Sequence, residues 1–307
     1  MSGLSNELRQ KLISTLIALT PEEGYTRTWL NKVKLLRVNE SMPHTPVLYE
    51  PCIVIVVQGK KTGVLGGREF VYDTQHYLVL SVPLPFTSQT VASDNEPLLA
   101  LSISLDLVMI AEILFELTEC DIPEAEPNSM LSTPLNESLG EAVFRLIQAA
   151  SDKIAAKVLG PGLLKEIYYH VLLDVQGGTL RAALSGKGHF GQIAVALRTI
   201  HGRFQERLDV ETLAKQAGMS TPAFFVHFKN FTGTTPIQYL KSTRLHQARL
   251  LMVKGGVSAA EASIKVGYES PTQFSREFKH FFGHPPLKEA QRLRELLKVK
   301  AESYWPD

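Results

Sequence analysis

The stretch FFVHFKNFTGTTP, residues 224–236, decides the fold of this chain, because its pattern returns in FSREFKHFFGHPP, residues 274–286. Both copies read F-x3-F-K-x3-G-x2-P, and each fixed position recurs fifty residues later. A repeat at a constant offset indicates one structural unit that is present twice. The region from Leu208 to Pro286 therefore predicts two copies of a small helical motif.

The residues before each copy predict a helix-turn-helix. Residues 209–217 have a helical apolar face that stops at Gly218, and Thr221-Pro222 then marks a new helix start. The second copy has the same order, with Gly267 as the stop and Ser270-Pro271 as the start. Two short helices joined by a tight glycine turn form a helix-turn-helix. We expect the two motifs at about 209–231 and 257–282.

The paired phenylalanines predict which face of each second helix is exposed. Phe224 with Phe228, and Phe274 with Phe278, lie four residues apart, so each pair shares one face and packs inward. The opposite face can then lie in a major groove of DNA. Residues 236–252 have the apolar stripe of one connecting helix, roughly 25 Å long, which could set the motifs about one DNA turn apart. A helical solenoid is the alternative, although two copies are few for one.

Residues 192–294 resemble the DNA-binding domain of AraC/XylS-type transcription regulators. The resemblance rests on the repeat, on the linker residues Pro236, Tyr239, Arg244 and Ala248, and on the run GYESPTQFSREFK at 267–279. It implies a sequence-specific, DNA-binding transcription regulator that places two helix-turn-helix motifs in successive major grooves of promoter DNA.

The N-terminal half resembles the N-terminal domain of a subgroup of the same regulators. The similar segments are LYEP at 48–51, VQGK at 57–60, YLVLSVP at 77–83 and KEIYY at 165–169. This resemblance implies a cupin-like β-barrel followed by helices, which senses a small-molecule effector and forms a homodimer. It does not identify the effector.

The pattern along the chain agrees with an α+β fold class. Short β-type runs alternate with Gly, Pro and Asp turns from residue 26 to residue 105, which favours a small antiparallel barrel or sandwich. A ligand pocket in it would be lined by inward residues of the strands at 52–58, 77–81 and 98–105. We expect an effector-sensing and dimerisation domain at 1–185, an all-α DNA-binding domain at 190–294 and a tail at 295–307. The expected strands are 33–38, 52–58, 62–65, 68–72, 77–81, 87–92 and 98–105, and the expected helices outside the two motifs are 6–19, 107–117, 133–150, 162–175, 191–201, 236–252 and 287–302.

Composition is that of an ordinary globular protein, with 44% hydrophobic and 21% charged residues. Residues 187–307 hold 18 Lys and Arg against 10 Asp and Glu, net +8, whereas residues 1–186 hold 14 against 21, net −7. A basic half beside an acidic half is typical of a nucleic-acid reader joined to a domain of another kind. Residues 1–10 lack the apolar core of a signal peptide, and the apolar run at 98–117 contains three acids. We therefore expect a cytoplasmic protein without membrane contact.

The outward positions of the two recognition helices, with the basic residues nearby, are the candidates for DNA contact. Arg276 could bond guanine O6 and N7 together, or instead contact a phosphate or pair near Glu277. The basic side chains are expected on phosphates, and otherwise on a solvated surface. The candidates are Thr221, Pro222, Phe225, Val226 and Lys229 in the first motif, and Pro271, Thr272, Ser275, Arg276, Lys279 and His280 in the second.

Phe225 and Val226 depart from the family pattern, which usually places polar or basic side chains there. Either they contact thymine methyl groups, or the N-terminal domain partly covers them in a closed state. Glu206, Asp209 and Glu211 could form an acidic patch for RNA polymerase, or serve as dipole partners at a helix start.

Two catalytic alternatives have little support. A metal-bearing cupin enzyme needs converging histidines and a carboxylate, and the strand region offers His44 and His76, 32 positions apart. A repair protein with a methyl-accepting cysteine needs a zinc-bound Cys cluster, and the chain has only Cys52 and Cys120. Cys52 is either core packing or a reactive thiol. We expect no enzyme activity, no metal and no cofactor.

Overall fold

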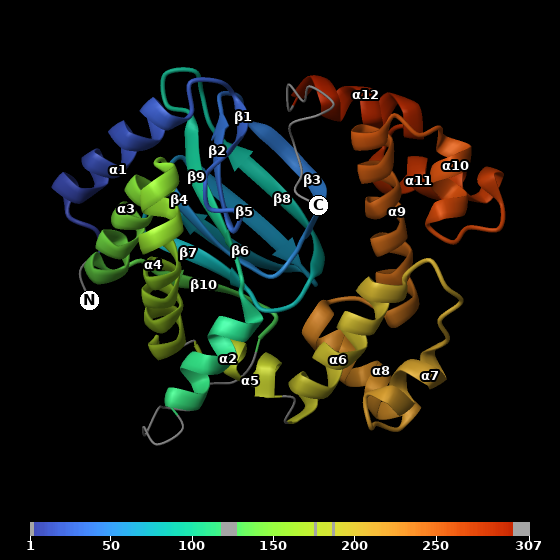
Figure 1. The fold of residues 1–307 in the computed structure, drawn as a ribbon. Helices are drawn as coiled ribbons and strands as arrows, with labels where there is room; N and C mark the ends of the chain where they lie inside the picture. The colour runs from blue at the N-terminus through green and yellow to red at the C-terminus, as the bar shows by residue number, and fades with distance from the viewer. Residues whose placement is uncertain (1–2, 118–127, 175–176, 186–187, 297–307) are drawn as a thin grey trace.

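A computed structural model of the chain describes residues 3–117, 128–174, 177–185 and 188–296 (Figure 1). The N-terminal part combines two antiparallel sheets with helices, and the described elements after residue 177 are all helices. The fold class is α+β, as the sequence predicts. Within the described residues, no helix is both long and apolar enough to cross a membrane.

Two antiparallel sheets form the N-terminal part. The larger has the strand order β1 (Gly24–Arg27), β2 (Val33–Val38), β9 (Leu98–Ser104), β4 (Cys52–Gln58), β7 (His76–Leu80), β10 (Met130–Pro134). The smaller has the order β3 (Met42–Tyr49), β8 (Leu84–Val91), β5 (Lys60–Leu65), β6 (Arg68–Asp73). No hydrogen-bonded pairing joins the two sheets within the described residues, so the cupin-like barrel is not closed.

Strand β4 is buried on both faces, as its apolar run predicts. Ile53, Ile55 and Val57 belong to one hydrophobic cluster, whereas Cys52 and Val54 belong to another. Successive side chains of a strand point to opposite faces, which explains this division. The first cluster packs the larger sheet against α1 (Asn6–Leu19), α3 (Glu137–Ala150) and α4 (Lys153–Leu173), and the second fills the space between the sheets.

The strands β1, β3 and β10 were not predicted, each for a local reason. β1 has four residues, too few for an alternating pattern. β3 contains Pro43 and Pro46, which its position at the edge of a sheet tolerates. Thr133-Pro134 ends β10, so the helix start predicted there is wrong. Helix α3 starts at Glu137, because the side chain of Asn136 caps it.

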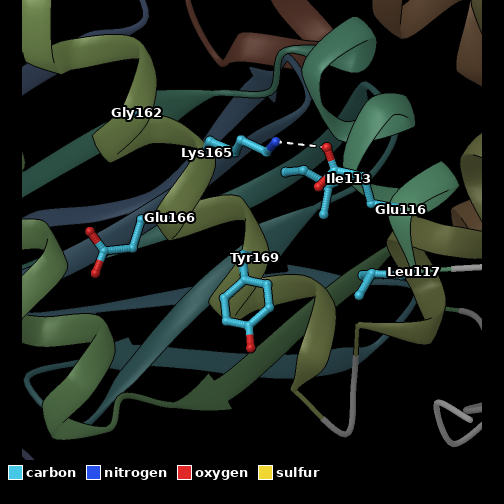
Figure 2. Close-up of a pocket in the computed structure, with 7 residues that line it drawn as sticks. All are labelled: Ile113, Glu116, Leu117, Gly162, Lys165, Glu166 and Tyr169. Carbon is cyan, nitrogen blue, oxygen red and sulfur yellow. Dashed lines mark hydrogen bonds and ion pairs between the residues drawn. The ribbon is translucent and has the colours of Figure 1, made fainter. Parts of the chain in front are cut away.

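The helix predicted at 162–175 is the second half of a longer helix, α4, which runs through Pro161. Proline lacks the backbone N–H and normally ends a helix, so the sequence pattern concealed the first half. Helix α2 (Leu107–Glu116) packs beside α4, and Nζ of Lys165 lies 2.9 Å from Oε1 of Glu116 (Figure 2).

The C-terminal part consists of short helices around one long helix. Its long helix, α9, has 20 residues and is about 30 Å long. The helix predicted at 287–302 is described only to residue 296, and the tail beyond lies outside the described residues. The helices are α5 (Gly178–Ser185), α6 (Gly188–Arg203), α7 (Val210–Gln216), α8 (Thr221–Thr232), α9 (Pro236–Gly255), α10 (Ala259–Lys265), α11 (Pro271–Phe282) and α12 (Pro286–Leu296).

Candidate nucleic-acid interface

The sequence repeat is a structural repeat. Helices α7 and α8 form the first helix-turn-helix, α10 and α11 form the second, and α9 joins them (Figure 1). The ring centroids of Phe224 and Phe228 are 5.4 Å apart with a tilt of 52°, and those of Phe274 and Phe278 are 5.4 Å apart with a tilt of 55°. All four rings are fully buried. Both second helices therefore turn the same face inward, as the phenylalanine spacing predicts.

The repeated glycine ends each second helix. Gly233 and Gly283 have φ values of 71° and 80°, in the left-handed region that favours glycine. Their N–H groups donate to the carbonyl oxygens of Lys229 and Lys279, both at 2.9 Å. This is the usual way in which glycine closes a helix, and it explains why both copies have glycine at this position.

The outer faces of α8 and α11 are open. Ten of the eleven candidate DNA-contact residues are exposed, and Ser275 is half-buried. Phe225 and Val226 keep 42% and 55% of their surfaces exposed, so the N-terminal part does not cover them in this structure. Contact of these residues with DNA stays a prediction.

The neighbours of Arg276 leave its guanidinium available. Glu277 accepts hydrogen bonds from Lys241 at 3.2 Å, Tyr268 at 2.9 Å and Gln273 at 3.0 Å. Burial raises the pKa of Glu277, but these hydrogen bonds outweigh it and the pKa is lowered overall. Glu277 thus anchors α11 to α9, and Arg276 forms no ion pair within the described residues.

The acidic residues near the first motif have local roles. Oδ1 of Asp209 accepts the N–H of Thr212 at 2.7 Å and caps α7. Glu206 pairs with Arg203 at 2.6 Å, and Glu211 lies in the first turn of α7. Asp209 and Glu211 therefore fit the helix-start alternative, whereas Glu206 lies between α6 and α7 and pairs with the last residue of α6.

The first helix-turn-helix shares a hydrophobic core with the sheets. Phe224 and Tyr239 lie in the same cluster as Met130 of β10. The hydroxyl of Tyr239 donates to the carbonyl of Pro83 and lies 2.8 Å from Nε2 of His201. Burial lowers the pKa of His201 to about 4, so its imidazole is neutral at pH 7. Apolar burial and these hydrogen bonds together hold the first motif on the N-terminal part.

A turn of the smaller sheet also meets the end of α8. Gly66, between β5 and β6, approaches Gly233 so closely that a Cβ on Gly233 would stand 2.7 Å from the Gly66 nitrogen. The hydroxyl of Ser129 donates to the carbonyl of Phe231, two residues before that glycine. The end of the first recognition helix is therefore in direct backbone contact with the sheet part.

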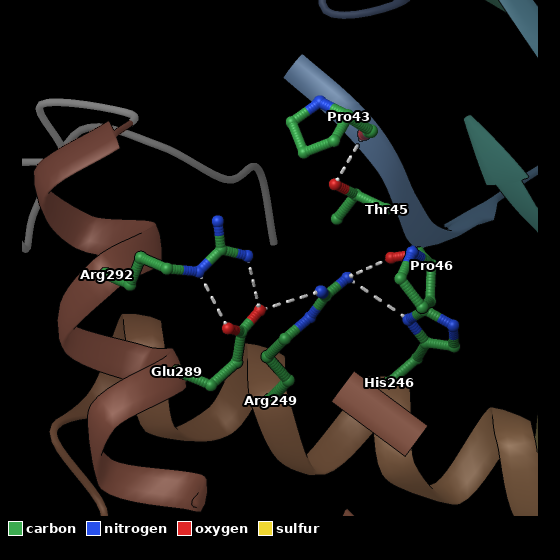
Figure 3. A network of polar contacts seen from close by, with 7 residues as sticks. All are labelled: Pro43, Thr45, Pro46, His246, Arg249, Glu289 and Arg292. Carbon is green, nitrogen blue, oxygen red and sulfur yellow. Dashed lines mark hydrogen bonds and ion pairs between the residues drawn. The ribbon is translucent and has the colours of Figure 1, made fainter. Parts of the chain in front are cut away.

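The second helix-turn-helix has its own core and is joined to the sheets by a polar network (Figure 3). Arg249 of α9 is buried, donates to the carbonyl of Pro46 in β3 at 3.1 Å, and lies 3.3 Å from Glu289 of α12. Glu289 is fully buried and accepts two further bonds from Arg292. Nδ1 of His246 lies 3.2 Å from Arg249. One guanidinium thus connects α9, α12 and β3.

A cleft of about 900 Å³ lies between the smaller sheet and the second motif. Leu65 and Phe86 contribute apolar surface to it, and Lys241, Arg276 and His280 contribute cationic or titratable groups. Two of these, Arg276 and His280, are also candidates for DNA contact. A molecule in the cleft would touch the sheet part and the second recognition helix together. The strands that we expected around a ligand pocket are instead neighbours in the larger sheet.

The space between the sheets holds a buried lysine. Lys61 is 7% exposed, and its Nζ donates to Oγ1 of Thr90 at 2.8 Å. Beside it, the hydroxyl oxygens of Tyr72 and Ser88 are 3.0 Å apart. Burial lowers the pKa of Lys61 to about 8, because loss of water disfavours the ammonium form.

This lysine makes stability depend on pH. The unfolded chain, whose lysines titrate near 10.5, binds more protons than the folded chain between about pH 8 and pH 10.5. The Lys61 contribution to the free energy of unfolding therefore rises with pH through that window. Lys61→Met is expected to remove this rise and to stabilise the protein by about 2 kcal/mol at pH 7. Urea unfolding at pH 7 and pH 9.5 measures it, with the exposed Lys60→Met as control. Equal behaviour of the two variants would contradict the prediction.

The residues behind the catalytic alternatives are placed as follows. Cys52 is buried, and burial raises the pKa of its thiol to about 12, which disfavours the reactive thiolate and fits core packing. Cys120 lies outside the described residues. His76 lies 3.1 Å from Asp73, and His44 lies in β3. Within the described residues, no three His, Cys, Asp or Glu side chains are grouped to hold a metal ion.

Known proteins share both halves of this arrangement. A family model described as "AraC-type transcriptional regulator N-terminus" matches residues 30–179, and one described as "Helix-turn-helix domain" matches residues 213–292. The HTH-type transcriptional regulator AlkR of Acinetobacter baylyi is 35% identical over 95 residues, which are 31% of each chain. The regulator ArgR of Pseudomonas aeruginosa is 23% identical over 159 residues, 50% of this chain and 47% of that protein.

The fold of most of this chain is also similar to that of a complete solved structure. A crystal structure of ToxT from Vibrio cholerae has a TM-score of 0.59 and 10% identity, and the match covers 88% of this chain and 98% of that one. By sequence, the chain spans only about a third of relatives such as AlkR and the Msm operon regulatory protein of Streptococcus mutans, 31% and 36% of their lengths. The model of the AraC-type N-terminus and the helix-turn-helix model match successive parts of the chain, residues 30–179 and 213–292, and the chain belongs to the AraC-type transcriptional regulators.

Proposed function

We propose that this chain is a transcription regulator that reads promoter DNA with α8 and α11. The observation that carries the proposal is the duplicated helix-turn-helix, in which both second helices bury matching phenylalanine pairs and leave their outer faces open. A recognition helix in the major groove reads base edges through such a face. The eleven candidate residues lie on or beside these faces. Residues 1–185 are the sensor domain and residues 190–294 the DNA-binding domain.

The partners follow from this role. The proposed partners are double-stranded promoter DNA, a small-molecule effector, a second copy of the chain and RNA polymerase, all in the cytoplasm. Neither a catalytic step nor a cofactor belongs to this role.

The cleft between the smaller sheet and α11 is the proposed effector site. Its volume suits a small molecule, and an occupant would contact Arg276 directly. ToxT has been solved with an unsaturated fatty acid bound. At 11% identity, its similarity to this chain is one of fold. An effector shifts the equilibrium only if it binds one arrangement of sensor and reader better than the other.

Filling the cleft should imitate an occupant. Thr87 of β8 lines the cleft, and Thr87→Trp is expected to weaken DNA binding by about fivefold or more, because it holds Arg276 and its neighbours against the sheet. Gln89→Trp, two residues along the same strand, is the control. Fluorescence anisotropy with a bound duplex measures both. Equal affinities of the two variants would count against the effector site.

We expect Arg276 of the second motif to read a base and Lys229 of the first motif to position the protein on the DNA backbone. Arg276→Ala should cost about 1–3 kcal/mol of binding free energy and relax the preference at one base pair, because a bidentate contact to guanine is lost. Lys229→Ala should weaken binding to every sequence and reduce the salt slope by about 1, because a phosphate contact is lost.

Anisotropy titrations with specific and scrambled duplexes at several salt concentrations separate these effects. Lys60→Ala, an exposed lysine of the sensor, is the control and should change neither quantity. If Arg276→Ala and Lys229→Ala act alike on all sequences, this division of roles is wrong.

A further inference from the structure

The outer face of α8 is apolar in the part of the helix that reads bases. A recognition helix contacts base edges with its N-terminal residues. In this part of α8, Pro222, Phe225 and Val226 are exposed, and Thr221 is the only polar residue among the exposed ones at 221–226. Phe225 and Val226 keep 42% and 55% of their surfaces exposed. The first motif therefore offers a base mainly carbon atoms.

The second motif has polar side chains at the same places. The helices α8 and α11 have twelve residues each and are related by the offset of fifty residues. Phe225 thus corresponds to Ser275, and Val226 corresponds to Arg276. Figure 1 shows α8 and α11 beside opposite ends of α9, so each motif presents its own face. Equivalent positions therefore carry two apolar groups in one motif, and a hydroxyl and a guanidinium in the other.

The other polar side chains of α8 are not placed to replace the apolar pair. The ring of His227 is half-buried and stacks on the ring of His189 of α6, with centroids 3.8 Å apart and a tilt of 30°. Thr232 is buried, and its hydroxyl donates to a backbone carbonyl of the same helix at 2.7 Å. Lys229 and Asn230 are exposed, but they lie in the second half of the helix, where phosphate contacts suit them.

An apolar pair in a major groove has one well-matched partner. Base edges there carry hydrogen-bond donors and acceptors, and the C5 methyl group of thymine is their apolar feature. Against another base, Phe225 and Val226 would displace water from donors or acceptors without replacing the lost hydrogen bonds, which costs binding free energy. Burying a methyl group against the two side chains is favourable instead. The pair thus favours thymine and disfavours the other bases.

We infer that the first motif selects thymine by its C5 methyl group, through Phe225 and Val226. The inference deepens the proposed function and rests on it, because α8 must lie in a major groove for this contact to form. The two motifs then recognise different base chemistry. One half-site is read by its methyl groups, and the other by guanine O6 and N7 through Arg276.

Replacing thymidine by deoxyuridine in a bound duplex tests the inference, because only the methyl group is lost. The probe is a duplex that the full chain enriches from a random pool, and fluorescence anisotropy measures its affinity after each single replacement. In the half-site that does not respond to Arg276→Ala, at least one replacement is expected to weaken binding about fourfold, the effect of one buried methylene-sized group.

Variants of the apolar pair assign this effect to α8. Phe225→Ala and Val226→Ala should each weaken binding to the thymidine duplex and bring its affinity closer to that of the deoxyuridine duplex. Both side chains are exposed, so the circular dichroism spectrum should not change. Ile264→Ala, at a residue 67% exposed on α10, is the matched control and should keep the fourfold difference.

Two results would overturn the inference. One is that deoxyuridine is tolerated at every position of the half-site, and the other is that the fourfold difference persists in both alanine variants. In either case, an enriched two-part site would leave the proposed function standing. A selection that enriches no two-part site would overturn the inference and the proposed function together.

Discussion

Replacing Arg249 by alanine is expected to lower the free energy of unfolding by about 3–5 kcal/mol, because the change breaks a buried ion pair by removing one partner. The guanidinium lies 3.3 Å from the fully buried Glu289, donates to the carbonyl of Pro46 and sits 4.3 Å from the ring centroid of Phe282. Burial lowers the pKa of Arg249 to about 10, so it remains charged at pH 7. The variant would leave an acid and a carbonyl with fewer partners inside the protein.

Urea unfolding monitored by circular dichroism measures this loss. Arg292→Ala is the matched control, because Arg292 bonds the same Glu289 but its side chain is 34% exposed, and it should cost about 1 kcal/mol. Equal losses for the two variants would show that Arg249 has no special part in joining the second motif to the sheets.

Gly267→Ala is expected to cost about 3 kcal/mol or more. Gly267 has φ +86°, and a Cβ there would stand 2.3 Å from the carbonyl oxygen of Gln205. Left-handed strain alone accounts for roughly 1–2 kcal/mol, and the backbone of the loop after α6 must also move. The backbone strain and the displaced loop both distort the turn of the second helix-turn-helix, so DNA binding should weaken as well.

The first motif supplies the control for that variant. Gly218 occupies the corresponding turn with φ +66°, but its nearest contact for a Cβ is Nε2 of Gln192 at 3.5 Å. Gly218→Ala should therefore show only the left-handed strain, about 1–2 kcal/mol. Thermal and urea unfolding of the two variants give the comparison, and a Gly218→Ala loss as large as that of Gly267→Ala would contradict it.

Local patterns predicted the elements whose cause is local. The phenylalanine pairs and glycine stops located both helix-turn-helix motifs, and the apolar run at 52–58 gave the central strand β4 with its exact bounds. The sequence did not predict the elements whose structure depends on contact with a residue far away in the chain. Thr133-Pro134 has the form of a helix start, yet pairing with β7 makes it the end of a strand. Pro161 concealed half of α4.

The same limit applies to the functional surfaces. Exposure of ten of the eleven candidate DNA-contact residues followed from helical periodicity. The buried position of Arg249, which connects the two parts of the chain, did not follow from it, because a long charged side chain on a helix ordinarily faces water. An Arg and a Glu forty residues apart carry no sequence signal that they will share a buried site. Nor did the sequence show that the cleft lies outside the sheets, against α11.

Selection of bound sequences from a random DNA pool, with the full chain at near-physiological salt, is the most direct test of the two-reader proposal. We predict a two-part motif whose halves lie about one helical turn, roughly 10 base pairs, apart. The same selection with Arg276→Ala should lose information at one base pair of one half and keep the other half. Enrichment of a single half-site, or of no sequence, would contradict the proposal that both helix-turn-helix motifs read DNA.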